Sequence, residues 1–245
     1  MLDQQVVLVT GGSNGIGADC VRLFAQAGAR VVIGFHRGRD RAEALLQELP
    51  GTGHVVMQVP LEDPNVHEAV ARAIQQTLGR LDILVNSAGY TRRIPHNDLD
   101  TLTPALFNQL LTANAGGTFS LTRALMPLLK QSGSGLVVNV SSVSAFTGSG
   151  SNIAYCAAKA AMDTMTLSLA RAFGPDVRCL CVSPASVDTG FVEGRSRAEI
   201  ESKAAKSPLG RVVEPRDVAL AVLACATHLT TATGTRIVID GGASL

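Results

Sequence analysis

Seven short apolar runs, rich in β-branched residues, constrain the fold of this chain more than any other feature of its sequence. In each run the apolar residues occupy both faces of the expected strand, which is typical of parallel strands covered on both sides. The runs occupy residues 6–9, 31–35, 55–59, 83–86, 136–140, 177–182 and 236–240. We therefore expect seven strands in one parallel sheet.

Amphipathic stretches with helical spacing separate these runs. They cover residues 16–28, 39–49, 64–78, 103–113, 117–131, 153–173 and 215–228. Strands that alternate with helices in this way predict a doubly wound α/β sheet with helices on both faces, because crossover connections are right-handed. No linker, repeat or low-complexity segment interrupts the 245 residues, so we predict a single domain, 1–245.

The composition excludes several classes of partner. The chain is 46% hydrophobic and 17% charged, and its formal net charge of +1 provides no basic field for nucleic acid. The apolar runs are too short to span a membrane, and the N-terminal MLDQQVV does not resemble a signal peptide. The five cysteines form no CxxC pair. We therefore expect a cytoplasmic protein with buried free thiols, no metal site, and neither nucleic-acid nor membrane partners.

The glycine-rich stretch TGGSNGIG, residues 10–17, follows the first apolar run directly. In a doubly wound sheet this turn faces the ligand crevice at the carboxyl ends of the strands. Gly11 can make the tight turn, Gly15 lets the backbone approach a pyrophosphate, and Gly17 allows close packing of helix and strand. A helix N-terminus there favours phosphate. We predict a dinucleotide-binding turn, with a plain tight turn as the alternative, because the spacing departs from GxGxxG.

The end of the second run lacks the acidic residue that would bind the ribose 2′-OH of NAD. The sequence there is GFHRGRD, and Phe35 occupies the expected position. His36 and Arg37 follow, and a guanidinium group suits a 2′-phosphate by charge and geometry. We predict that His36 and Arg37 bind this phosphate, so that NADP(H) is favoured over NAD(H). A solvated basic loop is the alternative.

Tyr155 and Lys159 lie four residues apart, on one face of a predicted helix. A phenol titrates near pH 10, and a neighbouring ammonium group lowers its pKa. Tyr155 could then exchange a proton with a carbonyl or alcohol oxygen near neutral pH. Taken alone, the motif is equally consistent with a surface Tyr–Lys pair.

Two further polar residues belong to the same predicted crevice. Ser142 follows the fifth run, and its hydroxyl could hold a substrate carbonyl. Asn114 stands within a helical pattern, where asparagine is unfavourable. Its side chain or its carbonyl could hold a water near Lys159, although a surface residue or a helix break is the alternative. The small-residue turn NSAG, 86–89, ends the fourth run at the same edge.

Together these motifs resemble the short-chain dehydrogenase/reductase family, and most closely its 3-oxoacyl-acyl-carrier-protein reductase group. The resemblance covers nearly the whole chain and also includes SPASVDT, 183–189, and VIDGG, 238–242. It implies a Rossmann-type fold, a homotetramer, and hydride transfer between a nicotinamide and a carbonyl or secondary alcohol. A 3-oxoacyl thioester is the favoured substrate. The alternatives are a sugar, a steroid or a quinone, or a non-catalytic dinucleotide sensor.

The resemblance also implies roles for individual residues. Tyr155 would be the acid/base, Lys159 would bind the nicotinamide ribose and lower the pKa of Tyr155, Ser142 would orient the carbonyl, and Asn114 would support a proton relay. The predicted cofactor contacts are Gly11, Ser13, Asn14, Gly15, Ile16, Gly17, His36, Arg37, Leu61, Asn86, Ala88, Gly89, Tyr155, Lys159, Pro184, Val187 and Thr189.

The sequence departs from the family at the adenine end and leaves the substrate end open. Pro60 stands where an aspartate is common, so adenine contact would pass to Leu61 or to the acidic residues after it. Residues 190–211 are polar and flanked by glycines, which predicts a lid or, alternatively, a surface helix and loop. Tyr90, Phe146 and Phe191 could supply apolar walls. Arg92 and Arg93 could bind a carboxylate, a phosphate or an acidic carrier protein, or they could be solvated.

Overall fold

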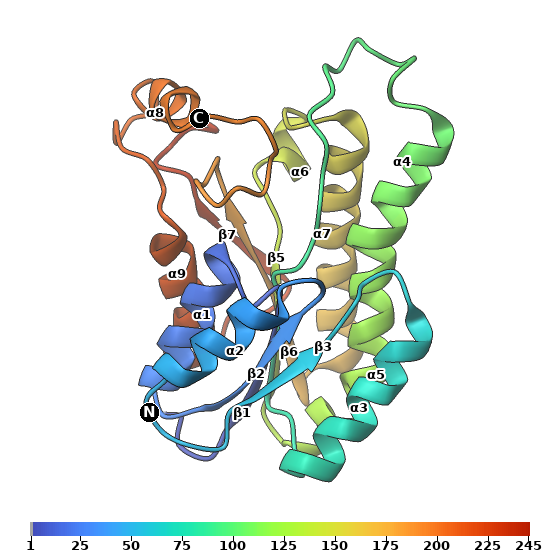
Figure 1. Ribbon diagram of the computed structural model, residues 1–245, viewed down its shortest axis with the longest axis vertical. Coiled ribbons are helices and arrows are strands. Elements are labelled where there is room, and N and C mark those ends of the chain that lie inside the picture. The colour runs from blue at the N-terminus through green and yellow to red at the C-terminus, as the bar shows by residue number, and fades with distance from the viewer. Residues whose placement is uncertain (1) are drawn as a thin grey trace.

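Seven parallel strands form one sheet in a computed structural model that describes residues 2–245 (Figure 1). The spatial order is β3-β2-β1-β4-β5-β6-β7, and the predicted doubly wound Rossmann-type fold is confirmed. The chain order reverses between β1 and β4, which creates a crevice at the carboxyl ends of these strands. The strands are β1 (Val6–Thr10), β2 (Arg30–Phe35), β3 (Val55–Gln58), β4 (Ile83–Asn86), β5 (Gly135–Val140), β6 (Val177–Pro184) and β7 (Thr235–Ile239).

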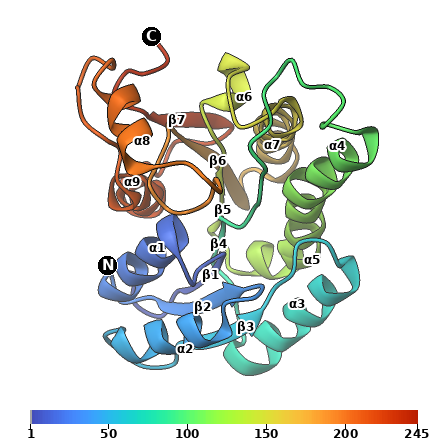
Figure 2. The same cartoon turned by 45° about the horizontal axis from the view of Figure 1, so that its top comes forward.

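Helices cover both faces of the sheet, so that the strands lie between two layers (Figure 2). One layer contains α1 (Gly15–Gln26), α2 (Arg39–Glu48) and α9 (Pro215–Thr227), and the other contains α3 (Pro64–Leu78), α5 (Gly117–Gln131) and α7 (Ile153–Phe173). Alternation along β1 explains the two cores: Val7 and Val9 join one, whereas Val6 and Leu8 join the other. Burial on both faces is why the strands read as continuous apolar runs.

Three short elements depart from the predicted pattern, and all three lie near the crevice. A π-helix, η1 (Thr112–Gly116), separates α4 (Pro104–Leu111) from α5, where the sequence predicted one helix ending at 113. A short helix, α6 (Ser144–Thr147), follows β5. The segment expected to be a lid contains α8 (Arg197–Ala204), which begins with a capping box formed by Ser196 and Glu199.

Within residues 2–245, no helix is long and apolar enough to cross a membrane. The same residues contain no group of three or more His, Cys, Asp or Glu side chains that could hold a metal ion. The cysteines are free and buried, as predicted; they are Cys20, Cys156, Cys179, Cys181 and Cys225.

The buried thiols make the stability of the fold sensitive to alkaline pH. Burial raises the pKa of Cys179 and Cys181 to about 12 and that of Cys225 to about 11, and it raises the pKa of Cys20 as well. A thiol whose folded-state pKa lies above its unfolded value stabilises the fold fully below about pH 9 and loses that contribution as the pH rises toward the folded pKa. The contribution of Lys159 to stability instead increases as the pH rises above about 8, because burial lowers its pKa to about 8.

We expect the free energy of unfolding to fall by about 3 kcal/mol between about pH 8 and about pH 10, because each of the four thiols contributes a loss of about 1.4 kcal/mol and Lys159 offsets only part of it. Urea unfolding under reducing conditions, followed by far-UV circular dichroism, measures this change. In Cys225→Ala, the free energy of unfolding should fall over the same pH interval by about 1.4 kcal/mol less than it does in the wild type. Equal stability at both pH values would contradict the prediction.

Candidate active site

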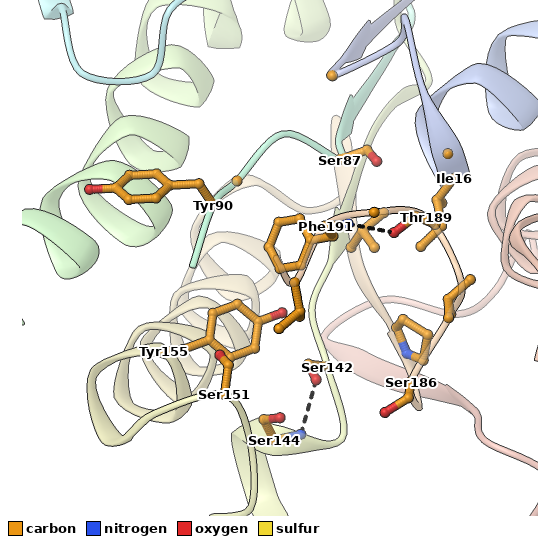
Figure 3. Close-up of a pocket in the computed structure, with 18 of the residues that line it drawn as sticks. Ile16, Ser87, Tyr90, Ser142, Ser144, Ser151, Tyr155, Ser186, Thr189 and Phe191 are labelled. Carbon is orange, nitrogen blue, oxygen red and sulfur yellow. Dashed lines mark hydrogen bonds between the residues drawn. The ribbon is translucent and has the colours of Figure 1, made fainter. Parts of the chain in front are cut away.

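A cavity of about 930 Å³ lies at the carboxyl ends of the strands. The turns after β1, β2, β4, β5 and β6 line it, together with residues of α7 (Figure 3). The sequence predicted a crevice at this edge. The predicted site residues that line the cavity are Gly11, Ser13, Asn14, Gly15, Ile16, Gly17, His36, Arg37, Leu61, Ala88, Gly89, Ser142, Tyr155, Lys159, Pro184, Val187 and Thr189.

The two other predicted residues, Asn86 and Asn114, are buried in the protein interior rather than exposed on this lining. At the end of β4, the Asn86 amide donates to Asn139 Oδ1 at 2.8 Å and to Thr122 Oγ1 at 3.2 Å. The side chain of Asn86 therefore connects the sheet to α5.

The glycine-rich turn is built for a close approach of backbone to ligand. Gly11 has φ +63° and Gly15 has φ +50°, a region that favours glycine. Gly17 packs so tightly that an added Cβ would overlap the carbonyl group of Gly11. The first turn of α1 contains no acidic side chain and no side-chain cap, so its free N–H groups suit a phosphate. These residues fit the pyrophosphate of a dinucleotide.

A cluster of positive charge lies beside this turn, after β2. An added Cβ at Gly38 would lie 2.5 Å from Arg41 Nη2 and 2.9 Å from Ser13 Oγ, so these groups converge on one point. Arg39 pairs with Glu43 at 2.8 Å, whereas no described carboxylate lies within ion-pair distance of Arg37 or Arg41. The predicted pair His36 and Arg37 therefore gains a third cavity-lining residue, Arg41. Arg41 follows Arg37 by four residues in the same basic segment, a signal visible in the sequence.

Tyr155 and Lys159 are buried together on α7, at 9% and 4% exposure. The Lys159 ammonium nitrogen lies 5.7 Å from the centroid of the Tyr155 ring and donates to the Val140 carbonyl at 2.8 Å. Ser142 lies close by at the end of β5, where its hydroxyl oxygen accepts the Ser144 amide at 3.1 Å (Figure 3). The structure thus brings three of the four predicted catalytic side chains to one place.

Burial controls the charge states of these groups. It raises the pKa of Tyr155 to about 12, although a hydrogen bond with Ser142 and the charge of Arg195 act in the opposite direction. It also lowers the pKa of Lys159 to about 8, against the opposing influence of Asp163. The resemblance implies that Lys159 lowers the pKa of Tyr155, whereas burial raises this pKa and the Lys159 ammonium group donates to the Val140 carbonyl. Tyr155 is therefore a protonated phenol at neutral pH.

Asn114 is the central residue of the π-helix and is fully buried. Its amide donates to the carbonyls of Leu110 and Tyr90, both at 2.9 Å, and its Oδ1 accepts the Tyr90 amide at 3.2 Å. The side chain therefore clamps the segment after β4. The Asn114 carbonyl accepts Thr118 Oγ1 at 2.7 Å.

The segment after β6 covers the substrate end of the cavity. The Phe191 ring lies 5.9 Å from that of Tyr155 (Figure 3). Arg195 reaches into the lining and donates to Ser186 Oγ at 3.3 Å. Sequence reasoning missed Arg195, because its neighbours come from distant parts of the chain.

Two expectations for the substrate end need correction. Arg93 pairs through both nitrogens with Glu199 of α8, at 3.1 Å, so it fastens the segment after β4 to the predicted lid. Phe146 was expected to form an apolar wall, but its ring instead packs beneath the Arg236 guanidinium, 4.6 Å from the ring centroid.

Comparison with known proteins identifies the family. A family model described as enoyl-(acyl carrier protein) reductase matches residues 11–244. A Streptomyces violaceoruber protein described as granaticin polyketide synthase ketoacyl reductase 2 is 38% identical, over 98% of this chain and 96% of that protein. L-fucose dehydrogenase of Bos taurus is 37% identical, over 98% and 90%. The crystal structure of a dehydrogenase/reductase from Sinorhizobium meliloti 1021 has a TM-score of 0.89 at 30% identity, over 100% of this chain and 96% of the other.

The chain therefore belongs to the short-chain dehydrogenase/reductase family, and the resemblance read from its motifs is confirmed. As a member of that family it is an oxidoreductase that acts on CH–OH groups with a nicotinamide dinucleotide, NAD(H) or NADP(H). The relatives carry names as different as ketoacyl reductase and L-fucose dehydrogenase. Membership of the family thus defines the class of reaction but does not identify the substrate, which depends on the residues of the site.

Proposed function

We propose that this protein is an NADP(H)-dependent carbonyl reductase, with a 3-oxoacyl thioester or another small carbonyl compound as its substrate. One observation carries the proposal: a single cavity joins the buried group of Tyr155, Lys159 and Ser142 to a glycine-rich turn flanked by unpaired arginines. The first part suits proton transfer to a carbonyl oxygen, and the second suits a dinucleotide with a 2′-phosphate.

The residues divide the work of reduction. NADPH, when bound, supplies a hydride to the carbonyl carbon. The Ser142 hydroxyl orients the carbonyl oxygen, and the protonated phenol of Tyr155 donates a proton to it. Lys159 stabilises the phenolate that this transfer leaves, because its ammonium group lies next to the ring and its pKa of about 8 keeps it mostly charged at neutral pH. The Asn114 carbonyl is proposed to hold a water that returns the proton.

For the cofactor, we propose that Arg37, Arg41 and His36 bind the 2′-phosphate. Arg41 and Ser13 of the glycine-rich turn converge at Gly38, and Arg37 lines the same cavity; neither arginine has a carboxylate partner among the described residues, which supports this choice. The other predicted cofactor contacts that line the cavity keep their assigned roles within the proposal, whereas the buried Asn86 side chain is left out of it. The homotetramer, the lid over 190–211 and the cytoplasmic location stay predictions.

The proposal is tested by following consumption of NADPH, and separately of NADH, with a panel of carbonyl compounds. We expect turnover with NADPH at a kcat/KM about 10- to 100-fold above that with NADH, because charge-assisted bonds to the phosphate are lost with NADH. Replacing both Arg37 and Arg41 by serine should remove this preference. Arg39→Ser is the matched control, since Arg39 is held by Glu43.

Two other outcomes would change the conclusion. Equal kcat/KM with both cofactors would discard the roles of Arg37 and Arg41 but keep the carbonyl chemistry. Dinucleotide binding without turnover of any carbonyl would overturn the proposed reductase.

A further inference from the structure

Arg195 lines the substrate end of the cavity, and beside it Arg93 and Glu199 form an ion pair, so that these three side chains carry a net positive charge. The charge of Arg93 lowers the pKa of Arg195, although burial lowers it more, and Glu199 is the carboxylate near both arginines. Glu199 is engaged by Arg93 through both of its oxygens at 3.1 Å. Two arginines therefore lie near one carboxylate, which pairs with Arg93. Arg195 has no ion pair among the described residues.

Arg195 is half-buried, and its hydrogen-bonding capacity is mostly unused. A guanidinium group has five N–H donors. In the part of the chain that the structure describes, the Arg195 side chain makes one hydrogen bond, from Nη1 to Ser186 Oγ at 3.3 Å. Burial lowers its pKa, which reflects the cost of holding this charge away from water. A half-buried guanidinium that lines a cavity and has most of its N–H groups free can donate to a ligand bound there.

The location of Arg195 relates it to the reacting group. It lines the same cavity as Tyr155, and its charge is felt by the phenol. Ser186, to which it donates, stands in the turn after β6 and faces the region of Ser142 and Tyr155 (Figure 3). A group bound to Arg195 would therefore belong to the molecule whose carbonyl meets Tyr155.

The rest of the lining at this end is rich in hydroxyl groups. Ser144 and Ser151 join Ser142 and Ser186 around Tyr155 (Figure 3). Ser142, Ser151 and Ser186 each have a hydrogen-bond partner in the protein, and a hydroxyl group has capacity for a further bond to a polar substrate.

We propose that Arg195 determines substrate specificity by binding an anionic group, a carboxylate or a phosphate, close to the reacting carbonyl. The substrates of this enzyme are then oxo acids or oxo phosphates rather than neutral ketones. This inference rests on the proposed carbonyl chemistry at Tyr155. Arginine suits either anion, since its planar fork matches two oxygen atoms at once.

The test compares matched pairs of carbonyl compounds that differ in charge. Suitable pairs are 3-oxobutanoate with its methyl ester, and dihydroxyacetone phosphate with dihydroxyacetone; the N-acetylcysteamine thioester of 3-oxobutanoate adds a neutral thioester. We expect the wild type to favour the anionic member of at least one pair by about 10- to 100-fold in kcat/KM. The pair that shows the preference distinguishes carboxylate from phosphate.

The key variant is Arg195→Met, which removes the charge and keeps most of the side-chain length. It should abolish the preference by raising KM for the anionic substrate, while kcat/KM for the neutral one falls much less and Kd for NADPH changes by less than about twofold. Arg195→Lys should restore part of the preference. Arg92→Met is the matched control, because Arg92 is an exposed arginine on the segment after β4 and lies outside the cavity lining.

Several results would overturn the inference while the proposed reductase stands. The first is a wild type whose kcat/KM is higher for the neutral members or the neutral thioester. The second is an Arg195→Met variant in which kcat/KM falls equally for the anionic and the neutral member of a pair. The third is an Arg195→Met variant with an unchanged preference and a raised Kd for NADPH. The last result would assign Arg195 to the dinucleotide.

If no carbonyl is reduced, the proposed function fails, and calorimetric titration of 3-oxobutanoate and of dihydroxyacetone phosphate into the protein with NADP⁺ decides the anion site. Weaker binding of either by Arg195→Met would retain the site. Binding that is equal in wild type and variant, or absent from the wild type, would overturn it.

Discussion

Tyr155→Phe should lower kcat by about 1,000-fold, because it removes the proton that the carbonyl oxygen takes up and leaves water as a poorly placed substitute. Binding of NADPH should change by less than about twofold, since the phenylalanine ring retains the packing of Tyr155 against Phe191. Stopped-flow or steady-state consumption of NADPH measures the first quantity, and fluorescence titration of NADPH measures the second.

Tyr90→Phe is the matched control for this substitution. The Tyr90 hydroxyl points away from Tyr155 (Figure 3), and its ring packs against a small apolar cluster that includes Ile94 and Leu110. We expect this variant to keep the wild-type kcat within about twofold. A Tyr155→Phe enzyme with a near-normal rate would show that the proton comes from another group.

Gly17→Ala should weaken NADPH binding by at least about tenfold, because the new methyl group displaces the phosphate-binding turn and misaligns several N–H donors. An added Cβ would overlap the Gly11 carbonyl and lie 3.1 Å from Gly12 Cα, both of which are backbone groups that cannot rotate away. The same overlap should destabilise the fold by about 1–3 kcal/mol. NADPH titration and urea unfolding measure the two effects.

Gly116→Ala provides the control for the loss of a glycine. Gly116 lies in the π-helix with a helical φ of −63°, and the atom nearest to an added Cβ is a methyl group at 3.9 Å. This variant should be unchanged or more stable by up to about 1 kcal/mol. If Gly17→Ala binds NADPH and unfolds like the wild type, close packing of α1 on β1 is not the reason for a glycine at this position.

The fold was predictable because the five inner strands of the sheet are buried on both faces. Each of these strands is then dominated by apolar residues, as in residues 6–9, and the helices carry amphipathic patterns, so the two kinds of segment can be distinguished. Local patterns also account for the glycine-rich turn and for the pairing of Tyr155 with Lys159. Local sequence patterns do not show which side chains from distant segments come into contact. This limits what the sequence reveals about the site.

Three features illustrate that limit. Arg93 and Glu199 are 106 residues apart, so the ion pair that removes Arg93 from substrate binding has no local signature. The helical spacing of Tyr155 and Lys159 predicts that the two side chains are neighbours. The pKa of Tyr155, however, is raised mainly by burial, which depends on residues from the whole cavity. Asn114 was recognised as unusual within a helix, whereas its partner, Tyr90, comes from another segment.

The strip of chain after β6 touches both ends of the cavity. An added Cβ at Gly15 would lie 2.9 Å from Thr189 Cβ, Phe191 covers Tyr155, and Arg195 follows four residues later. One strip of sequence therefore contacts both the glycine-rich turn and the group around Tyr155. If the proposed function holds, grafting this strip from a relative changes contacts to the dinucleotide and to the carbonyl substrate together, whereas the preference for NADP(H) over NAD(H) stays with the arginines after β2.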